Sequence, residues 1–277
     1  MKIEKTGGKK MKKFAASVLA LILVLALSAC GLSKTSSGTE TKKTIKVDTN
    51  AAYAPFEYMD KGQIIGFDVD VMNALAKESG YRVQLKNIGW DPLFVEVKNK
   101  SADMAISSIT ITKERAQTYD FSVPYFLSTN EILVPEKSDI KSAADLKGKT
   151  VAVQSGTTAQ EVLEGLFGKN NKNIKKFKQN TTAIMDLVEG GSDAVVADNT
   201  VVEEYAKNNP DKKLKVIKDT KAFPAEYYGL MFPKGSKLKA DFDKAINKIY
   251  DNGTYTKIYK KWFKTEPDIQ KLKAQQK

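Results

Sequence analysis

Histidine is absent from the 277-residue sequence, and cysteine occurs once, at Cys30. These two residue types supply many of the nucleophile–base pairs of enzymes and most protein ligands of transition metals. The sequence therefore lacks the usual catalytic residues, and it predicts no metal site and no cofactor. A single cysteine also excludes a disulfide bond within one copy of the chain.

A long apolar run is also missing. The longest continuous run, residues 18–27, is about half of the roughly 20 residues that a membrane-spanning helix needs. Lysines precede this run and small residues follow it, which is typical of a signal peptide that takes no part in the fold. Translation starts at Met1 or at Met11, because the first ten residues add nothing that a signal peptide needs.

Residues 27–30, with the sequence LSAC, resemble the lipobox of bacterial lipoproteins. The resemblance implies that residues 1–29 are a signal peptide cleaved before Cys30, and that Cys30 carries lipid. The protein would then be extracytoplasmic and anchored to the bacterial cell membrane. An ordinary signal peptide, or an uncleaved anchor with an incidental cysteine, is the alternative. Residues 30–43 are rich in serine, threonine and glycine, which predicts a flexible tether.

The chain is basic, but its charge does not indicate nucleic acid as a partner. Removing the six lysines and one glutamate of residues 1–29 lowers the formal net charge from +12 to +7. The remaining excess is spread over lysine-rich segments, with no basic cluster interleaved with aromatics and no nucleic-acid-binding signature. A secreted chain held at an anionic membrane surface explains the same charge.

About 220 residues remain between residues 44 and 267, which is more than one typical core needs and enough for two domains. Short apolar strands alternate with helical patterns in two successive units, which predicts an α/β fold with largely parallel sheets and flanking helices. The first unit has predicted strands at 44–49, 82–88 and 102–108 and helices at 67–80, 92–100 and 113–119; the second has strands at 149–154, 174–178 and 193–198 and helices at 157–168, 182–191 and 200–208.

The last elements, a strand within 227–236 and helices at 238–253 and 254–263, have no partners of their own. We expect them to pack on the first unit, so that the chain crosses between the units near 126–131 and 221–226. Two crossings form a hinge over a cleft, as in proteins that close on a ligand. The predicted domains are lobe 1 (44–127 and 226–267), lobe 2 with the hinge segments (128–225), and a polar tail (268–277).

Ligands of open α/β sheets bind beyond the carboxyl ends of the strands. The residues found there combine one cation, one anion, neutral hydrogen-bonding groups and aromatic rings. They are Asn50, Tyr53, Phe56, Trp90, Ser107, Ser108, Thr110 and Arg115 in the first unit, and Gln154, Ser155, Gly156, Thr157, Thr158 and Asp198 in the second.

This set of residues predicts a site for a free α-amino acid. Arg115 can hold a carboxylate through two parallel hydrogen bonds, and residues 154–158, QSGTT, open a helix whose free N–H groups favour an anion. Asp198 can accept hydrogen bonds from an ammonium group. Simpler roles stay open at this point, namely a helix N-cap for Asp198, a surface charge for Arg115 and core packing for Tyr53.

Several motifs, in order along the mature chain, resemble the polar amino-acid class of bacterial solute-binding lipoproteins that serve ABC importers. They are AYAPFEY, GFDVDVMNALAKE, DMAISSITITKER, YDFSVPYF, VAVQSGTT, DAVVAD, and YGLMFPKGS followed by NGTYTKIYKKWF. The resemblance implies a type II periplasmic-binding-protein fold, with two α/β lobes and a doubly crossed hinge that close around one amino acid. The expected partners are a free amino acid and the membrane subunits of an ABC permease.

The resemblance also implies a role for each site residue. The ligand carboxylate would be held by Arg115 with the main-chain N–H groups of Thr110 and Thr158, and the ammonium group by Ser108 and Asp198. The ligand side chain would lie between Tyr53 and Trp90, and its far end would face Asn50, Gln154 and Thr157.

Substrate choice depends on the far end of the site. Relatives that bind basic amino acids place an acidic residue where Asn50 stands, and a buried cationic tip without a partner is costly. A neutral polar side chain is therefore expected, with glutamine favoured over glutamate, cystine or a basic amino acid. Some relatives resemble dehydratases, but Asp198 is the one cleft acid that the sequence identifies, so binding without chemistry is the prediction.

Overall fold

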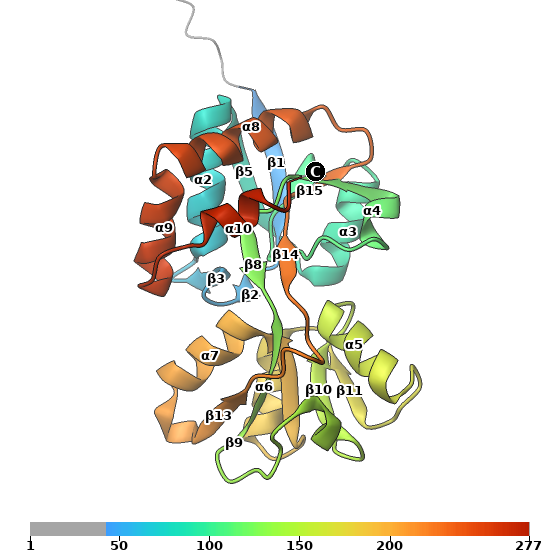
Figure 1. The fold of residues 1–277 in the computed structure, drawn as a ribbon. Helices are drawn as coiled ribbons and strands as arrows, with labels where there is room; N and C mark the ends of the chain where they lie inside the picture. Colours follow the sequence, from blue (N-terminus) through green and yellow to red (C-terminus); the bar gives the residue numbers. More distant parts are fainter. Residues whose placement is uncertain (1–42, 277) are drawn as a thin grey trace, which may run out of the picture. The chain divides into compact units, whose positions relative to one another are not determined.

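The computed structural model describes residues 43–276 (Figure 1). The predicted signal peptide, Cys30 and all but the last residue of the predicted tether lie outside the described residues. Within residues 43–276, no helix combines the length and the apolar character needed to cross a membrane.

Lobe 1 is built on a five-stranded sheet with the order β5-β1-β6-β15-β7. β1 (Thr44–Thr49) is parallel to its neighbours β5 (Arg82–Asn87) and β6 (Met104–Ala105), whereas β15 (Met231–Pro233) is antiparallel to β6 and to β7 (Tyr119–Phe121). Four strands therefore share one direction and β15 alone is reversed.

Lobe 2 repeats this arrangement with the order β11-β10-β12-β9-β13. β10 (Val151–Gln154) is parallel to β11 (Ile174–Phe177) and to β12 (Ala194–Asp198), whereas β9 (Asn130–Pro135) is antiparallel to β12 and to β13 (Leu214–Ile217). The reversed strand is here β9. The prediction of two mostly parallel sheets is confirmed.

Two extended segments run side by side between the sheets (Figure 1). They are β8 (Phe126–Ser128) and β14 (Glu226–Tyr228), which pair antiparallel with Glu226 opposite Ser128. β8 leads into β9 of lobe 2, and β14 leads back to β15 of lobe 1. The doubly crossed hinge is thus confirmed, and the reversed strand of each sheet is the one attached to the hinge. The single strand predicted within 227–236 is instead two short strands in different sheets.

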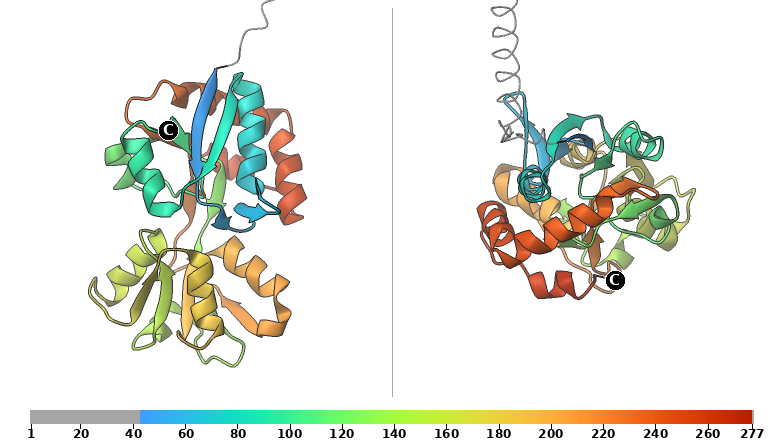
Figure 2. Two further views of the ribbon diagram at one scale, coloured as in Figure 1. Left: turned by 180° about the vertical axis from the view of Figure 1, so that it is seen from behind. Right: turned by 90° about the horizontal axis from the view of Figure 1, so that it is seen from above.

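Helices cover both faces of the lobe 1 sheet (Figures 1 and 2). α2 (Phe67–Ser79), α8 (Leu238–Asp251) and α9 (Thr254–Phe263) lie on one face and α3 (Trp90–Lys98) on the other. Successive strand residues point to opposite faces, so Phe232 packs with the α8 side and Met231 with the α3 side. The C-terminal helices pack on lobe 1, as expected.

The lobe 2 sheet is covered in the same way. α5 (Thr158–Phe167) packs on the face that carries Val151 and Val153, whereas α6 (Asn180–Val188) and α7 (Asn199–Asn208) pack on the face that carries Ala152. The near-continuous apolar sequence of β10 follows from this burial on both faces.

Several short elements escaped prediction because they are too brief to show a period. They are β2 (Ala52–Tyr53), β3 (Glu57–Asp60), β4 (Gln63–Ile65), the 3-10 turns η2 (Ala143–Leu146) and η3 (Pro210–Lys212), and α10 (Ile269–Lys273). The helix predicted at 113–119 is present but shorter, as α4 (Arg115–Thr118). The helix α10 corrects the prediction that residues 268–277 form only a polar tail. Leu272 of α10 is 2% exposed and belongs to the core of lobe 1, although the residues around it are polar.

Gly66 joins the β2–β4 hairpins to α2 at a point of very close backbone approach. Its φ is 144°, and a Cβ atom at this position would lie 1.9 Å from the carbonyl oxygen of Phe56. Glycine is therefore required for two reasons, its φ and the space available. The close approach brings the start of α2 against the segment that precedes Glu57.

We predict that Gly66→Ala lowers the free energy of unfolding by about 2–4 kcal/mol, because the backbone must move to admit a methyl group. Gly62→Ala is the matched control, since Gly62 also has a positive φ of 82° but no atom within 4 Å of an added Cβ. Urea denaturation of both variants measures the difference. Equal losses for the two would show that φ alone, and not the contact with Phe56, requires glycine.

Candidate functional site

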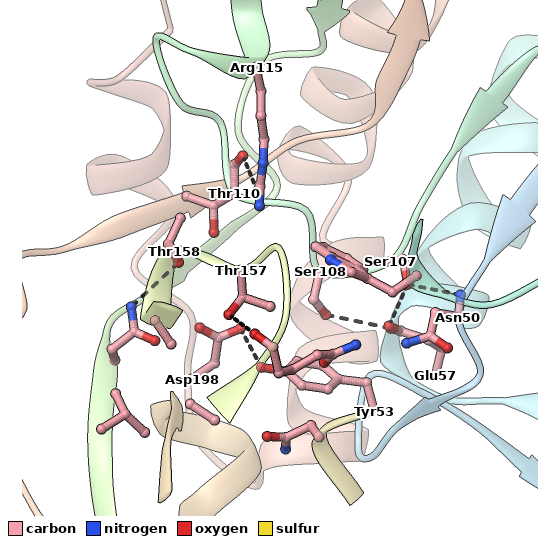
Figure 3. A pocket seen from close by; sticks show the side chains of 17 residues that line it. Asn50, Tyr53, Glu57, Ser107, Ser108, Thr110, Arg115, Thr157, Thr158 and Asp198 are labelled. Carbon is pink, nitrogen blue, oxygen red and sulfur yellow. Dashed lines mark hydrogen bonds between the residues drawn. The ribbon is translucent and has the colours of Figure 1, made fainter. Parts of the chain in front are cut away.

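A cleft between the two lobes contains the predicted site (Figure 3). The space between its lining atoms, which includes open solvent at the mouth, is about 440 Å³. All ten residues predicted to contact the ligand line it. They are Asn50, Tyr53, Trp90, Ser108, Thr110, Arg115, Gln154, Thr157, Thr158 and Asp198.

The parallel strands explain why these residues meet. Asn50 follows β1 and Ser108 lies just beyond β6, at the same edge of the lobe 1 sheet. Gln154 and Asp198 end β10 and β12 at one edge of the lobe 2 sheet. The hinge sets these two edges opposite each other, so that each lobe contributes one side of the cleft (Figure 1).

Arg115 lies across the cleft and is not a surface charge. Its backbone N–H donates to Thr112 Oγ1 at 3.1 Å at the start of α4. The guanidinium donates to the carbonyl of Thr110 at 2.9 Å and, across the cleft, to that of Gly156 at 3.0 Å. Its carbon also lies 5.6 Å from the Trp90 ring centroid and 5.4 Å from that of Phe94.

Arg115 keeps its charge in this setting. Burial lowers the pKa of the guanidinium from its ordinary value, whereas surrounding carboxyl groups raise it. An arginine side chain nevertheless remains protonated in proteins. Among the described residues that line the cleft, Arg115 is the one cation.

The start of α5 faces the same part of the cleft. Thr157 is its N-cap residue, and the Thr157 hydroxyl accepts from the N–H of Gln160 at 3.4 Å. The N–H of Thr158 belongs to the first helical turn, which has no preceding carbonyl to bind it. With the helix dipole, this N–H and Arg115 favour an anion between them.

Glu226 of the hinge strand β14 holds this region together. Its Oε2 accepts from the hydroxyls of Thr110 in lobe 1, at 3.0 Å, and Thr158 in lobe 2, at 2.8 Å. Its Oε1 accepts from the amide of Asn130 at 2.9 Å. Burial, followed by the nearby charge of Asp198, raises the pKa of Glu226 to about 7.

Asp198 stands at the N-cap position of α7, but its carboxylate does not cap the helix. Oδ2 instead accepts from the hydroxyls of Tyr53 at 2.7 Å and Tyr228 at 2.6 Å. The bond from Tyr53 joins the lobes, since Tyr53 belongs to lobe 1. Burial raises the pKa of Asp198, although both tyrosine hydroxyls and Arg115 oppose the shift. The N-cap interpretation is therefore wrong for the side chain.

Sequence reasoning missed three polar residues that line the cleft, Glu57, Asn130 and Asn180. Glu57 matters most because it is a second cleft acid besides Asp198. It is 1% exposed and accepts from the hydroxyls of Ser107 at 2.8 Å and Ser108 at 3.5 Å. The sequence signal that could have identified Glu57 is that it is the single charged residue of the stretch AYAPFEY.

The charged form of Glu57 is disfavoured. Burial comes first among the causes and the neighbouring carboxyl of Asp68 second, and together they raise the pKa of Glu57 well above its ordinary range. Figure 3 shows Glu57 beside Asn50, Ser107 and Ser108, apart from Arg115 and Thr158. The cleft thus has an anion-binding end and an end that carries a buried acid.

Residues 45–265 match the model of the bacterial extracellular solute-binding proteins, family 3. The chain belongs to this family. The match spans almost all of the described chain and confirms the resemblance drawn from the motifs. The chain is therefore an amino-acid-binding, extracytoplasmic component of an ABC transporter, and its relatives in this comparison are binding proteins rather than enzymes.

Individual relatives of this solute-binding protein are named for basic amino acids. It is 39% identical over 262 residues to a "Probable histidine-binding protein" of Neisseria gonorrhoeae, covering 92% of this chain and 97% of the relative. The solved structure of the arginine-, lysine-, histidine-binding protein ArtJ from Geobacillus stearothermophilus is 56% identical, with a TM-score of 0.82, covering 83% of this chain and 100% of ArtJ. An ancestral arginine-binding protein, solved with bound glutamine, is 38% identical with a TM-score of 0.75, covering 80% and 98%.

We predict that Glu226 makes this solute-binding protein less stable as pH rises. A carboxyl whose pKa is higher in the folded than in the unfolded state favours folding while it is protonated. That contribution is complete below the unfolded value of 4.5 and is lost as pH rises through about 7. Glu226→Gln keeps the shape and should remove on the order of 1–3 kcal/mol of the decline between pH 5 and pH 8.

Urea denaturation at these two pH values measures this decline. Part of it should remain in the variant, because burial also raises the pKa of Asp48 and of Asp68 to about 6. An unchanged decline in Glu226→Gln would contradict the assignment.

Proposed function

We propose that this solute-binding protein captures a cationic amino acid, with arginine the first candidate, and delivers it to the permease of an ABC importer. The observation that carries the proposal is Glu57, a buried acid at the end of the cleft away from Arg115. It supplies the counter-charge that the neutral Asn50 does not. A neutral Asn50 therefore does not by itself require a neutral ligand, because Glu57 lies at the same end of the cleft.

Charge pairing supports arginine over a neutral ligand. Arginine brings one carboxylate and two cations, and the cleft lining offers one cation, Arg115, and two acids, Asp198 and Glu57. Each charged group of the ligand then has one partner, which offsets the cost of burying it. The name of a relative also supports a basic ligand, since ArtJ is named for arginine, lysine and histidine. Glutamine stays the second candidate, because Asn50 is neutral and an ancestral arginine-binding protein was solved with glutamine bound.

The proposed roles of the individual residues follow the expectations from the family. Arg115 and the N–H groups of Thr110 and Thr158 hold the carboxylate, and Asp198 and Ser108 hold the ammonium group. Tyr53 and Trp90 enclose the aliphatic part of the ligand side chain. Its tip lies near Asn50, Gln154 and Thr157, to which we add Glu57.

We also propose the domain limits and the anchoring. Lobe 1 comprises 44–127 and 226–267, to which we add α10 because Leu272 packs in its core, and lobe 2 with the hinge segments comprises 128–225. Cleavage after residue 29 exposes Cys30 for lipidation, and residues 30–43 tether the lobes to the membrane. The ligand is released unchanged. Glu57 is the one further cleft acid that a dehydratase could use, and mass analysis of ligand recovered after incubation tests for any product.

A panel of ligands tests the specificity. Arginine should raise the thermal midpoint most, because selective binding stabilises the folded state. In Glu57→Gln, arginine affinity should fall about 100-fold or more, since a buried cation then lacks its partner, whereas glutamine should lose less than tenfold. Isothermal titration calorimetry measures both. Asp48→Asn is the matched control, because Asp48 is equally buried but does not line the cleft.

The outcomes separate the candidates. A shift with glutamine, glutamate or cystine alone would reject the cationic ligand but keep the transport role. Absence of a shift with all twenty amino acids would reject the role as an amino-acid receptor.

We predict that Arg115→Ala weakens binding of every amino acid ligand about 1,000-fold, because each has the same carboxylate and the cleft lining has no second cation for it among the described residues. Arg82→Ala is the control, since Arg82 is an exposed arginine of β5 in the same lobe. Calorimetry with the preferred ligand compares the two variants. Nearly equal affinities would show that Arg115 does not hold the carboxylate.

A further inference from the structure

We propose that Glu57 and Asp68 share one proton, and that a cationic ligand side chain displaces it on binding. The affinity for arginine would then increase with pH, whereas the affinity for a neutral ligand of the same shape would not. The inference rests on the proposed function, because it assumes that a cation reaches Glu57. It adds a second carboxyl, Asp68, which does not line the cleft.

The two carboxyl groups form a buried pair. Glu57 begins β3 and is 1% exposed, and Asp68 lies in the first turn of α2 and is 0% exposed. Both accept a hydrogen bond from Ser108, Asp68 from its backbone N–H at 2.8 Å and Glu57 from its hydroxyl at 3.5 Å, and each influences the pKa of the other. Two adjacent buried carboxylates cannot both stay ionised without a large cost, so one proton is retained.

Hydrogen bonding assigns the proton to Glu57. Asp68 Oδ2 accepts from the N–H of Ser108 and the hydroxyl of Tyr125, both at 2.8 Å, and the N-terminus of α2 favours an anion there. Among the described residues no group donates to the buried Asp68 Oδ1, so a protonated Glu57 would supply the hydrogen bond that this oxygen lacks. Consistently, the pKa of Asp68 is raised to about 6, but that of Glu57 is raised well above its ordinary range.

The groups within residues 43–276 that hydrogen-bond to the pair are serines and a tyrosine, none of which is a cation. Three tyrosines surround the pair, Tyr53 near Glu57, and Tyr125 and Tyr255 near Asp68. The same carboxyl groups help to raise the pKa values of these tyrosines, so they stay neutral. Serine hydroxyls complete the hydrogen bonds of Glu57. The other nearby charge is the anion Asp198, which shares Tyr53 with the pair.

A guanidinium at this end of the cleft would therefore be the first positive charge beside Glu57. It stabilises the carboxylate form, so the proton leaves Glu57 for solvent and the pair becomes doubly ionised. A neutral ligand gives no such stabilisation, and the proton stays. The site can then accept neutral side chains at low pH and favour cationic ones as pH rises.

Calorimetry with arginine and citrulline tests this inference. Citrulline replaces the guanidinium by a neutral urea group of nearly the same shape. At pH 7, titrations in phosphate, Hepes and Tris buffers give the number of protons released, from the dependence of the heat on the ionisation enthalpy of the buffer. We expect arginine to release between about half and one proton more than citrulline, and its affinity relative to citrulline to rise up to about tenfold per pH unit between pH 6 and 8.

The difference in proton release between arginine and citrulline does not include the contributions of other titrating groups, which are the same for both ligands. Asp198 and Glu226 lie at the end that binds the ligand backbone, which the two ligands share. Glu57→Gln should abolish the difference in proton release, because a glutamine holds no exchangeable acid proton. Should the variant fail to fold, the wild-type titrations decide alone.

Two results would overturn the inference. Arginine that binds with the same proton balance as citrulline, and with a pH-independent affinity ratio, would refute the shared proton but leave the proposed function intact. Arginine that does not bind the wild-type protein would refute both.

Discussion

Burying carboxyl groups next to one another costs free energy unless cations or hydrogen-bond donors compensate for their charge. This constraint governs the centre of the molecule, where Glu57, Asp68 and Asp198 are buried and Glu226 is half-buried, in or directly behind a cleft with Arg115 as the one cation of its described lining. Serine, threonine and tyrosine hydroxyls donate to all four. Because too few positive charges are present, retained protons and the ligand must supply the rest.

The donors that satisfy these carboxyl groups come from both lobes and from the hinge. Tyr53 of lobe 1 donates to Asp198 of lobe 2, and threonines of the two lobes donate to Glu226 on the hinge strand. Arg115 reaches Gly156 of the opposite lobe. The same contacts that compensate for buried charge thus join the lobes. Charge compensation and the contact between the lobes therefore depend on the same residues.

Many elements could be predicted from sequence because their signals are local. The strand at 44–49 has the predicted bounds, and the helix predicted at 67–80 ends one residue earlier. Prediction failed where burial is decided by distant contacts. Leu272 lies in a polar segment, yet it is covered by the core of lobe 1. The short strands before α2 have no period to detect, and Glu57 belongs to one of them.

The sequence by itself determined the family, the two α/β lobes, the double crossing and the set of residues suited to an amino-acid backbone. These features depend on strand ends and motifs that are contiguous in the chain. Only the tertiary structure decided the role of Asp198, whose carboxylate binds tyrosines instead of capping a helix. It also decided the charge at the far end of the cleft. Glu57 becomes a buried acid because serines 50 and 51 positions away donate to it and Asp68 lies against it, and no local pattern records such contacts.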